Sequence, residues 1–243
     1  MKRLFFAAIA LVLAAAVLTG CSAAEEMRTF TDDAGRVLTV PAEIDAVSPS
    51  GPLAQIVLYS MNPDLFVSTA TKLTNLERAY LDTRLTALPV TGQFYGSKST
   101  MNAEEIMELN KKLNIDVVLD VGSLKSGIAE DLNTIQAQTG VTFAFITQDK
   151  LADIAPSYLR LGALLGMEEQ GEVLSNYAAK LIAESEAAMK KVGDTKASLI
   201  YVTKTDGNAV SLIGSGDTSY HGEIINILGN NLAPAAVSAS GLG

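Results

Sequence analysis

The chain has almost none of the residues that disulfide-stabilised proteins and metal cages require. Its 243 residues include one cysteine, one histidine and no tryptophan. One cysteine excludes an internal disulfide framework and a zinc site made of several cysteines. One histidine excludes a metal cage made of several imidazoles, and it leaves triad catalysis with little support. The chain has no nucleophile elbow, phosphate loop or His-Glu-x-x-His sequence either. We therefore expect a protein that is not an enzyme and that holds no cofactor or metal ion of its own.

Positive charge is also scarce. The chain has 18 lysines and arginines against 27 aspartates and glutamates, which gives a net charge of -9. An acidic surface repels phosphate backbones, so a nucleic-acid partner is not expected. Apolar residues make up 48% of the chain and charged residues 19%, which is enough apolar surface for a folded core. The length fits one large domain or two small lobes.

Residues 1–20 have the pattern of a lipoprotein signal peptide. Lys2 and Arg3 precede residues 4–18, a run of 15 residues without a polar side chain that is too short to span a membrane. Residues 18–21 read Leu-Thr-Gly-Cys and resemble a bacterial lipobox, in which cleavage leaves a lipid-carrying cysteine at the new N-terminus. The alternative for Cys21 is a buried free thiol. We expect lipidation of Cys21, a linker over residues 21–27, and tethering outside the membrane of a bacterial or archaeal cell, in the periplasm or at the surface.

Residues 28–150 alternate between strand and helix patterns and are expected to form an N-terminal α/β lobe with a parallel sheet. Asp and Gly punctuation in residues 28–40 predicts a hairpin. The expected strands are 44–47, 65–70, 115–121 and 141–146, and the expected helices are 53–61, 75–84, 103–113 and 128–139. Strands 115–121 and 141–146 are almost wholly apolar, which is typical of strands buried on both faces.

Residues 151–193 are expected to be connecting helices, 151–165 and 168–192. The second is about 37 Å long at 1.5 Å per residue. It is either a helix on the flank of a core or a rigid backbone that joins two lobes. Residues 194–243 are expected to form a partial C-terminal α/β lobe, with strands 198–203 and 209–213 and a helix over 220–228.

The order of these parts resembles the iron-siderophore and vitamin B12 substrate-binding lipoproteins of ABC importers. The resemblance rests on the lipobox, on Thr-Asp-Asp-Ala-Gly-Arg at 31–36, on Asn-Ile-Asp-Val-Val at 114–118, and on residues 221–231. It implies two α/β lobes joined by a long rigid helix, with the second lobe incomplete beside that of the family. It also implies capture of a ligand between the lobes and delivery to a membrane permease and its ATPase, without catalysis.

Loops at the carboxyl ends of parallel strands would line such an interlobe site. The first-lobe candidates are Ser48, Ser50, Phe94, Tyr95, Ser123 and Lys125. The two early serines precede a helix start, which suits anionic oxygens. Adjacent aromatic residues cannot both point inward on an extended segment, so one of the pair is expected to face the cleft while the other belongs to the core. For Lys125 the alternative is a solvated loop charge.

The second-lobe candidates are Ser215, Tyr220 and His221, near the start of helix 220–228. The alternative is that this segment only caps the helix and that the histidine is solvated. A lone histidine cannot build a metal site, so a chelated metal is favoured over a bare ion. The family also docks on its permease through one acidic residue per lobe, and Glu130 matches the first-lobe position. For Glu130 the alternative is a helix-start charge favoured by the helix dipole.

The function expected from these features is that of a monomeric, lipid-anchored receptor for an ABC importer. Its ligand is expected to be a ferric siderophore, with haem or a corrinoid next. Two alternatives remain at this point. One is a surface lipoprotein that acts as a sensor or interaction partner without transport, and the other is a truncated paralogue without function.

Overall fold

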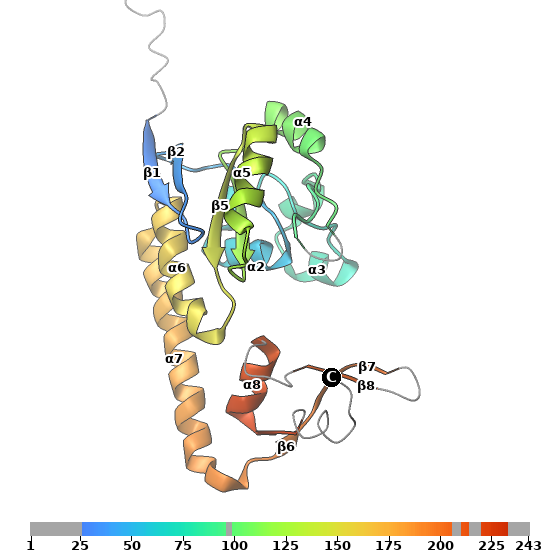
Figure 1. The fold of residues 1–243 in the computed structure, drawn as a ribbon, viewed down its shortest axis with the longest axis vertical. Helices are drawn as coiled ribbons and strands as arrows, with labels where there is room; N and C mark the ends of the chain where they lie inside the picture. The colour runs from blue at the N-terminus through green and yellow to red at the C-terminus, as the bar shows by residue number, and fades with distance from the viewer. Residues whose placement is uncertain (1–25, 96–98, 206–209, 214–219, 233–243) are drawn as a thin grey trace, which may run out of the picture.

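The chain forms two lobes beside one long helix (Figure 1). The structure, a computed structural model, describes residues 26–95, 99–205, 210–213 and 220–232. The first lobe lies along the upper part of helix α7 (Glu168–Val192), and the second lobe lies near its lower end. None of the helices within these ranges is long and apolar enough to cross a membrane.

A three-stranded parallel sheet forms the centre of the first lobe. Its order is β3 (Val47–Pro49), β4 (Val117–Gly122) and β5 (Thr142–Thr147). The expected strands 115–121 and 141–146 are confirmed to within two residues. Because all three strands run in the same direction, their carboxyl ends meet at one edge of the sheet, where ligand sites of such sheets form.

The expected strand 44–47 is wrong in its first residues, since β3 begins only at Val47. The backbone N–H groups of Asp45 and Ala46 each donate to the Asp116 carboxylate at 2.9 Å. These donors are therefore satisfied by a side chain rather than by a neighbouring strand. These two donors are therefore not available to a β-ladder.

The expected strand 65–70 is also wrong as a continuous strand. The segment forms two isolated bridges, Val47 with Phe66 and Thr69 with Val90. Its start is taken up by a 3-10 helix over Pro63–Leu65, which Asn62 caps by accepting the Asp64 N–H at 2.9 Å. The apolar run thus extends the sheet only at two points.

The expected helix 75–84 ends early. Helix α3 covers Asn75–Tyr80, and a separate 3-10 helix covers Thr83–Ala87. Asp82 accepts the N–H of Arg84 at 2.8 Å and so begins the second helix at the point where the first was expected to continue.

Helices cover both faces of the sheet. They are α2 (Pro52–Met61), α4 (Ala103–Leu113) and α5 (Ile128–Thr139), as expected to within one residue. Alternate residues of β4 point to opposite faces. Val117 and Leu119 belong to the core cluster that contains α2, whereas Val118 belongs to the cluster that contains α4 and α5.

The expected N-terminal hairpin is confirmed and lies beside β5. It consists of β1 (Met27–Thr31) and β2 (Val37–Pro41), paired antiparallel. Asp32 and Arg36, in its turn, form a buried ion pair of 2.6 Å whose side chains are 0% and 6% exposed. Phe145 of β5 donates its backbone N–H to the Asp32 carboxylate at 3.2 Å. The hairpin turn therefore fastens to the open edge of the sheet.

The two connecting helices are confirmed with the expected bounds. Helix α6 covers Leu151–Leu165, and α7 covers 25 residues. The helices approach closely where Gly162 faces Gly171. A Cβ atom built on Gly171 would lie 2.6 Å from the backbone oxygen of Tyr158 and 3.1 Å from the Cα of Gly162. Only residues without a side chain fit at this crossing.

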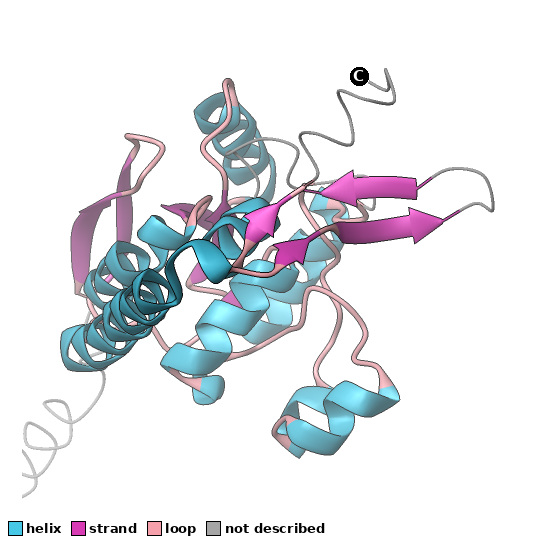
Figure 2. Ribbon diagram, turned by 90° about the horizontal axis from the view of Figure 1, so that it is seen from below, coloured by secondary structure: helices cyan, strands magenta, loops and turns pink. Residues whose placement is uncertain are grey.

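In the described part of the second lobe there are two small sheets and one helix. Strands β6 (Ser198–Leu199) and β9 (Asn230–Asn231) pair in parallel, and β7 (Tyr201–Thr205) and β8 (Val210–Ile213) pair antiparallel. The expected strand 198–203 is therefore two strands with different partners. Figure 2 shows the β7–β8 pair extending away from the helices.

Helix α8 (Tyr220–Leu228) matches its expected range and lies between the strands of the second lobe and the connecting helices. The Glu223 carboxylate accepts the backbone N–H of Leu151, the first residue of α6, at 2.6 Å. A carboxylate at a helix N-terminus is stabilising because it meets unpaired N–H groups and the positive end of the helix dipole. This contact joins the second lobe to the start of the connecting helix α6.

Candidate ligand-binding site

A pocket of about 290 Å³ opens at the carboxyl end of β4, where the sequence patterns place a ligand site. It is lined by Tyr95, Asp120, Val121, Gly122, Ser123, Lys125, Ile128 and Phe145. Three of the expected ligand residues, Tyr95, Ser123 and Lys125, therefore meet at one place. Contact of these residues with a ligand stays a prediction.

Asp120 is the charged residue at the floor of this pocket. It lies within the buried strand β4, is 7% exposed, and accepts a hydrogen bond from the Ser50 hydroxyl. Burial raises the pKa of the Asp120 carboxyl, and the Ser50 hydrogen bond and the charges of Lys125 and Arg36 oppose that rise. Sequence reasoning missed this residue, although a lone acid in the apolar run Val-Val-Leu-Asp-Val was a visible signal.

Asp120→Asn is expected to leave the protein at least as stable as the original at neutral pH. Because the pKa of the Asp120 carboxyl is higher in the folded than in the unfolded state, its contribution to stability falls as the pH rises through the interval between the two values. Asparagine removes that loss and still accepts the Ser50 hydroxyl. Urea unfolding at neutral and acid pH measures the effect. The difference between the two proteins should shrink as the pH falls toward 3.8, the ordinary pKa of aspartate. A variant that is clearly less stable at neutral pH would contradict this account.

Tyr95 forms one wall of the pocket. Its hydroxyl donates to the Asp131 carboxylate at 3.2 Å, and its ring meets that of Phe94 edge-on, with centroids 4.4 Å apart. Phe94 itself packs against Phe143 of the sheet, at 5.7 Å between centroids. Burial raises the pKa of the Tyr95 hydroxyl far above its usual range, and the Asp131 charge adds to this effect. The hydroxyl is therefore neutral at physiological pH.

The loop before Tyr95 is held by backbone contacts. Gly92 has a φ of +84°, and a Cβ atom there would lie 2.7 Å from the backbone nitrogen of Met101, so no other residue fits without movement. The Phe94 N–H donates to the Ser50 carbonyl at 2.8 Å. These contacts fix the aromatic pair beside the carboxyl end of β3.

The placement of Ser48 and Ser50 requires a correction. Both hydroxyls were expected to be offered to a ligand, but the residues are 0% and 1% exposed. Ser48 accepts from the Ser68 hydroxyl at 2.7 Å, inside the lobe, and Ser50 donates to Asp120. The reason is that β3 lies in the interior, so its end is covered. Ser50 acts on the pocket only through Asp120.

The loop after β4 supplies the other two polar side chains. The Ser123 hydroxyl donates to the Asp149 carboxylate, which lies in the loop after β5. Lys125 is exposed and lines the pocket, and its positive charge lowers the pKa of the Asp120 carboxyl. A ligand in this pocket would meet an ammonium group and a buried carboxylate.

The remaining expected site residues are only partly described. Ser215 and Cys21 lie outside the described residues, and so do the side chains of Tyr220 and His221, although both residues begin α8. Glu130 is exposed in the first turn of α5. Within the described ranges, no group of three or more histidine, cysteine, aspartate or glutamate side chains could hold a metal ion.

Comparison with known proteins gives matches among solved structures. No protein-family model matches the chain, and no curated protein matches its sequence. An ABC transporter solute binding protein from Sulfurospirillum deleyianum is 19% identical with a TM-score of 0.68, over 84% of this chain and 62% of that chain. A periplasmic solute binding protein from Veillonella parvula is 22% identical with a TM-score of 0.63. The match covers 86% of this chain and 60% of that protein. The protein IsdE of S. aureus, complexed with heme, is 20% identical with a TM-score of 0.56. The match covers 77% of this chain and 64% of that protein.

This chain thus spans less than two thirds of the length of these structures. At such identities the likeness concerns the fold. The predicted fold class is confirmed: the chain has the mixed α/β fold of periplasmic binding proteins whose two lobes are joined by a helical backbone.

Proposed function

We propose that this chain is the solute-binding component of an ABC importer and that it captures an iron complex for delivery to a permease and its ATPase. The observation that carries the proposal is the pocket at Asp120, which lies at the carboxyl edge of the sheet in a helical-backbone binding-protein fold. Three of the proteins with similar structures bind heme, which supports a chelated metal as cargo. The candidate cargoes are a ferric siderophore, haem and a corrinoid.

The groups in the pocket suit the organic shell of a metal complex. Tyr95 offers an aromatic face, Lys125 offers an ammonium donor, and Asp120 offers a carboxylate acceptor. A flat or ring-containing chelator can stack on the tyrosine, and its carboxylate or hydroxamate oxygens can bind the lysine. The proposal therefore assigns recognition to the chelator rather than to direct ligation of the metal.

Titration of the purified protein with haem, a ferric trishydroxamate and cyanocobalamin tests this proposal. Because the chain has no tryptophan, its fluorescence comes from 7 tyrosines, and quenching of that emission reports binding. We expect one of the three complexes to bind with 1:1 stoichiometry. Tyr95→Ala should weaken that binding about tenfold, since an aromatic contact contributes on the order of 1 kcal/mol beyond the area it buries.

Tyr177→Ala is the matched control, because Tyr177 lies on α7, is 61% exposed and does not line the pocket. Its affinity should equal that of the original protein. If none of the three complexes binds, the iron-complex proposal is overturned. If one binds and Tyr95→Ala leaves the affinity unchanged, the pocket at Asp120 is not its site.

The same proposal includes the membrane arrangement. The chain is proposed to act as a monomer outside the cell membrane, tethered by lipid on Cys21. Glu130 is proposed as the first-lobe contact with the permease, and its exposed position in the first turn of α5 supports that role.

A further inference from the structure

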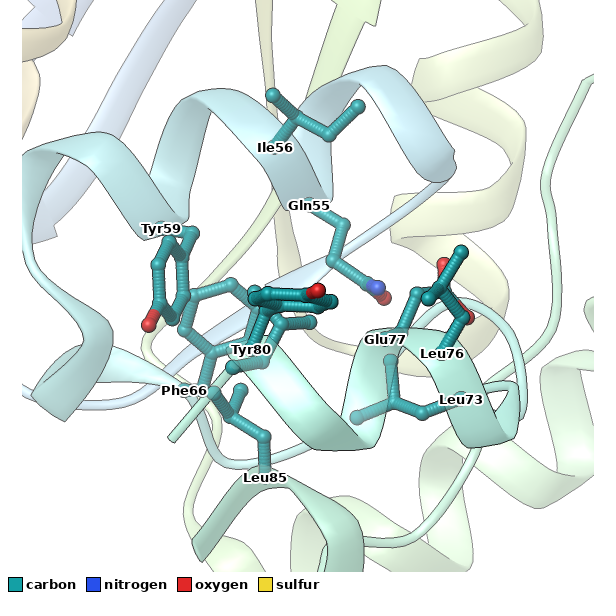
Figure 3. Close-up of a pocket in the computed structure, with 10 residues that line it drawn as sticks. Gln55, Ile56, Tyr59, Phe66, Leu73, Leu76, Glu77, Tyr80 and Leu85 are labelled. Carbon is teal, nitrogen blue, oxygen red and sulfur yellow. The ribbon is translucent and has the colours of Figure 1, made fainter. Parts of the chain in front are cut away.

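A second pocket, of about 370 Å³, lies between α2 and α3 of the first lobe (Figure 3). It is lined by Gln55, Ile56, Tyr59, Phe66, Leu73, Leu76, Glu77, Tyr80, Leu81 and Leu85. None of these residues lines the pocket at Asp120. The volume lies within the range of small-molecule sites in proteins.

Most side chains in the walls of this pocket are apolar, both at the floor and at the rim. Phe66 and Leu85 at the floor are 1% and 3% exposed. At the rim, Ile56, Leu76 and Tyr80 are 67%, 71% and 81% exposed. Apolar side chains gathered around a hollow in this way lose contact with water only when something fills the hollow. The arrangement therefore favours an apolar occupant.

Gln55 supplies a polar group inside the apolar walls. Its side chain is nine-tenths buried, and its Oε1 accepts the backbone N–H of Ala70 at 2.9 Å. Because that N–H requires an acceptor, the amide cannot turn round, and its Nε2 must point the other way. Figure 3 shows the end of this side chain reaching from α2 into the space toward α3. No described residue accepts a hydrogen bond from Nε2, and because no buried side-chain nitrogen or oxygen in the described residues lacks a partner, this donor is one that water reaches and that a ligand in the pocket can use.

The charge of the lining residues limits the kind of ligand. No lysine or arginine lines the pocket, and Glu77 is its one charged lining residue. Hydrogen bonds from the backbone and side chain of Thr74 lower the pKa of the Glu77 carboxyl, so this group is negative at neutral pH. An anionic ligand would meet a like charge there, and no lysine or arginine among the lining residues would offset it.

We propose that the pocket between α2 and α3 binds a small, neutral, mostly apolar molecule through one acceptor oxygen, which receives a hydrogen bond from the Gln55 amide. The rings of Tyr59, Phe66 and Tyr80 suit a flat ligand body. This site shares no residue with the pocket proposed for the iron complex, so it does not depend on the function proposed above.

The probe for this site is prodan, a neutral naphthalene with a ketone oxygen whose emission moves to shorter wavelength in apolar surroundings. We expect saturable 1:1 binding with a dissociation constant on the order of 100 µM or tighter, as ligands of this size reach in good pockets. The anion 8-anilinonaphthalene-1-sulfonate is similar in size and should bind at least about fivefold more weakly because of Glu77.

Two variants locate the probe. Leu76→Arg places a charge at the exposed rim without touching the core, and it should weaken prodan binding at least about tenfold. Gln55→Met removes the donor and should weaken binding about two- to tenfold. Circular dichroism must first show that the Gln55 variant is folded, because Ala70 loses its acceptor.

Leu159→Arg is the matched control, since Leu159 lies on α6, is 47% exposed and does not line the pocket. It should bind prodan like the original protein. The proposal is overturned if Leu76→Arg leaves the affinity unchanged, or if prodan binding is lost in Tyr95→Ala and retained in Leu76→Arg. The second result would place the probe in the pocket at Asp120.

Discussion

Asp32→Ala is expected to lower the free energy of unfolding by about 3–5 kcal/mol, the usual cost of removing one partner from a buried ion pair. The substitution leaves Arg36 buried and charged, with a side chain that is 6% exposed. It also removes the acceptor for the backbone N–H groups of Ala34, Arg36 and Phe145. Urea unfolding followed by circular dichroism measures the loss, which is a large share of the stability of an ordinary domain.

Asp64→Ala is the control for this prediction. Asp64 pairs with Arg84 at 3.4 Å on the surface, where the side chains are 82% and 41% exposed. Exposed pairs contribute at most about 1 kcal/mol, because water screens both charges. Similar losses in the two variants would show that burial of the Asp32–Arg36 pair does not determine its contribution.

Gly171→Val is expected to lower the free energy of unfolding by about 1–3 kcal/mol, the usual range for overpacking. A Cβ at this position would lie 2.6 Å from the carbonyl oxygen of Tyr158, which is backbone and cannot turn aside. The two helices would have to separate along the crossing at Gly162. Thermal and urea unfolding measure the effect. We also expect the more open helix pair to shift the position of the second lobe, which small-angle scattering would detect.

Asn176→Ala on the same helix is the control. Asn176 is exposed on α7, so alanine there changes only helix propensity and should be neutral or slightly stabilising. At position 171 too, alanine has a higher helix propensity than the glycine that the chain has there. If Gly171→Val leaves the stability unchanged, the close approach of α6 and α7 does not constrain this position.

Apart from α3, the helices were predictable because their ends carry local signals. Asn102 begins α4, Gly140 ends α5, and Gly166 ends α6, each through a hydrogen bond within a few residues. The strands were less predictable, since a strand needs a partner that is distant in sequence. Residues 65–70 are apolar enough for a strand, but the sheet meets them only at Phe66 and Thr69.

In the candidate site too, features set by local sequence were predictable, and features set by contacts between distant segments were not. The placement of Ser123 and Lys125 at one pocket was predictable because both follow β4, whereas Tyr95 reaches it through the bond of Phe94 to Ser50 beside the end of β3. The burial of Ser48 and Ser50 was not predictable from the sequence, because it depends on which other parts of the chain cover β3. The pocket between α2 and α3 joins segments that share no sequence motif, so only the folded structure reveals it.

The hairpin beside β5 has a consequence for the newly made chain. Asp32 and Phe145 are separated by 113 positions, so the ribosome releases the hairpin long before the strand that it must meet. Closing so long a loop comes late in folding. Until then β5 keeps a row of unpaired backbone groups, which is a template for pairing with another chain. We therefore expect the first lobe to be most prone to aggregation just before its N-terminal residues dock.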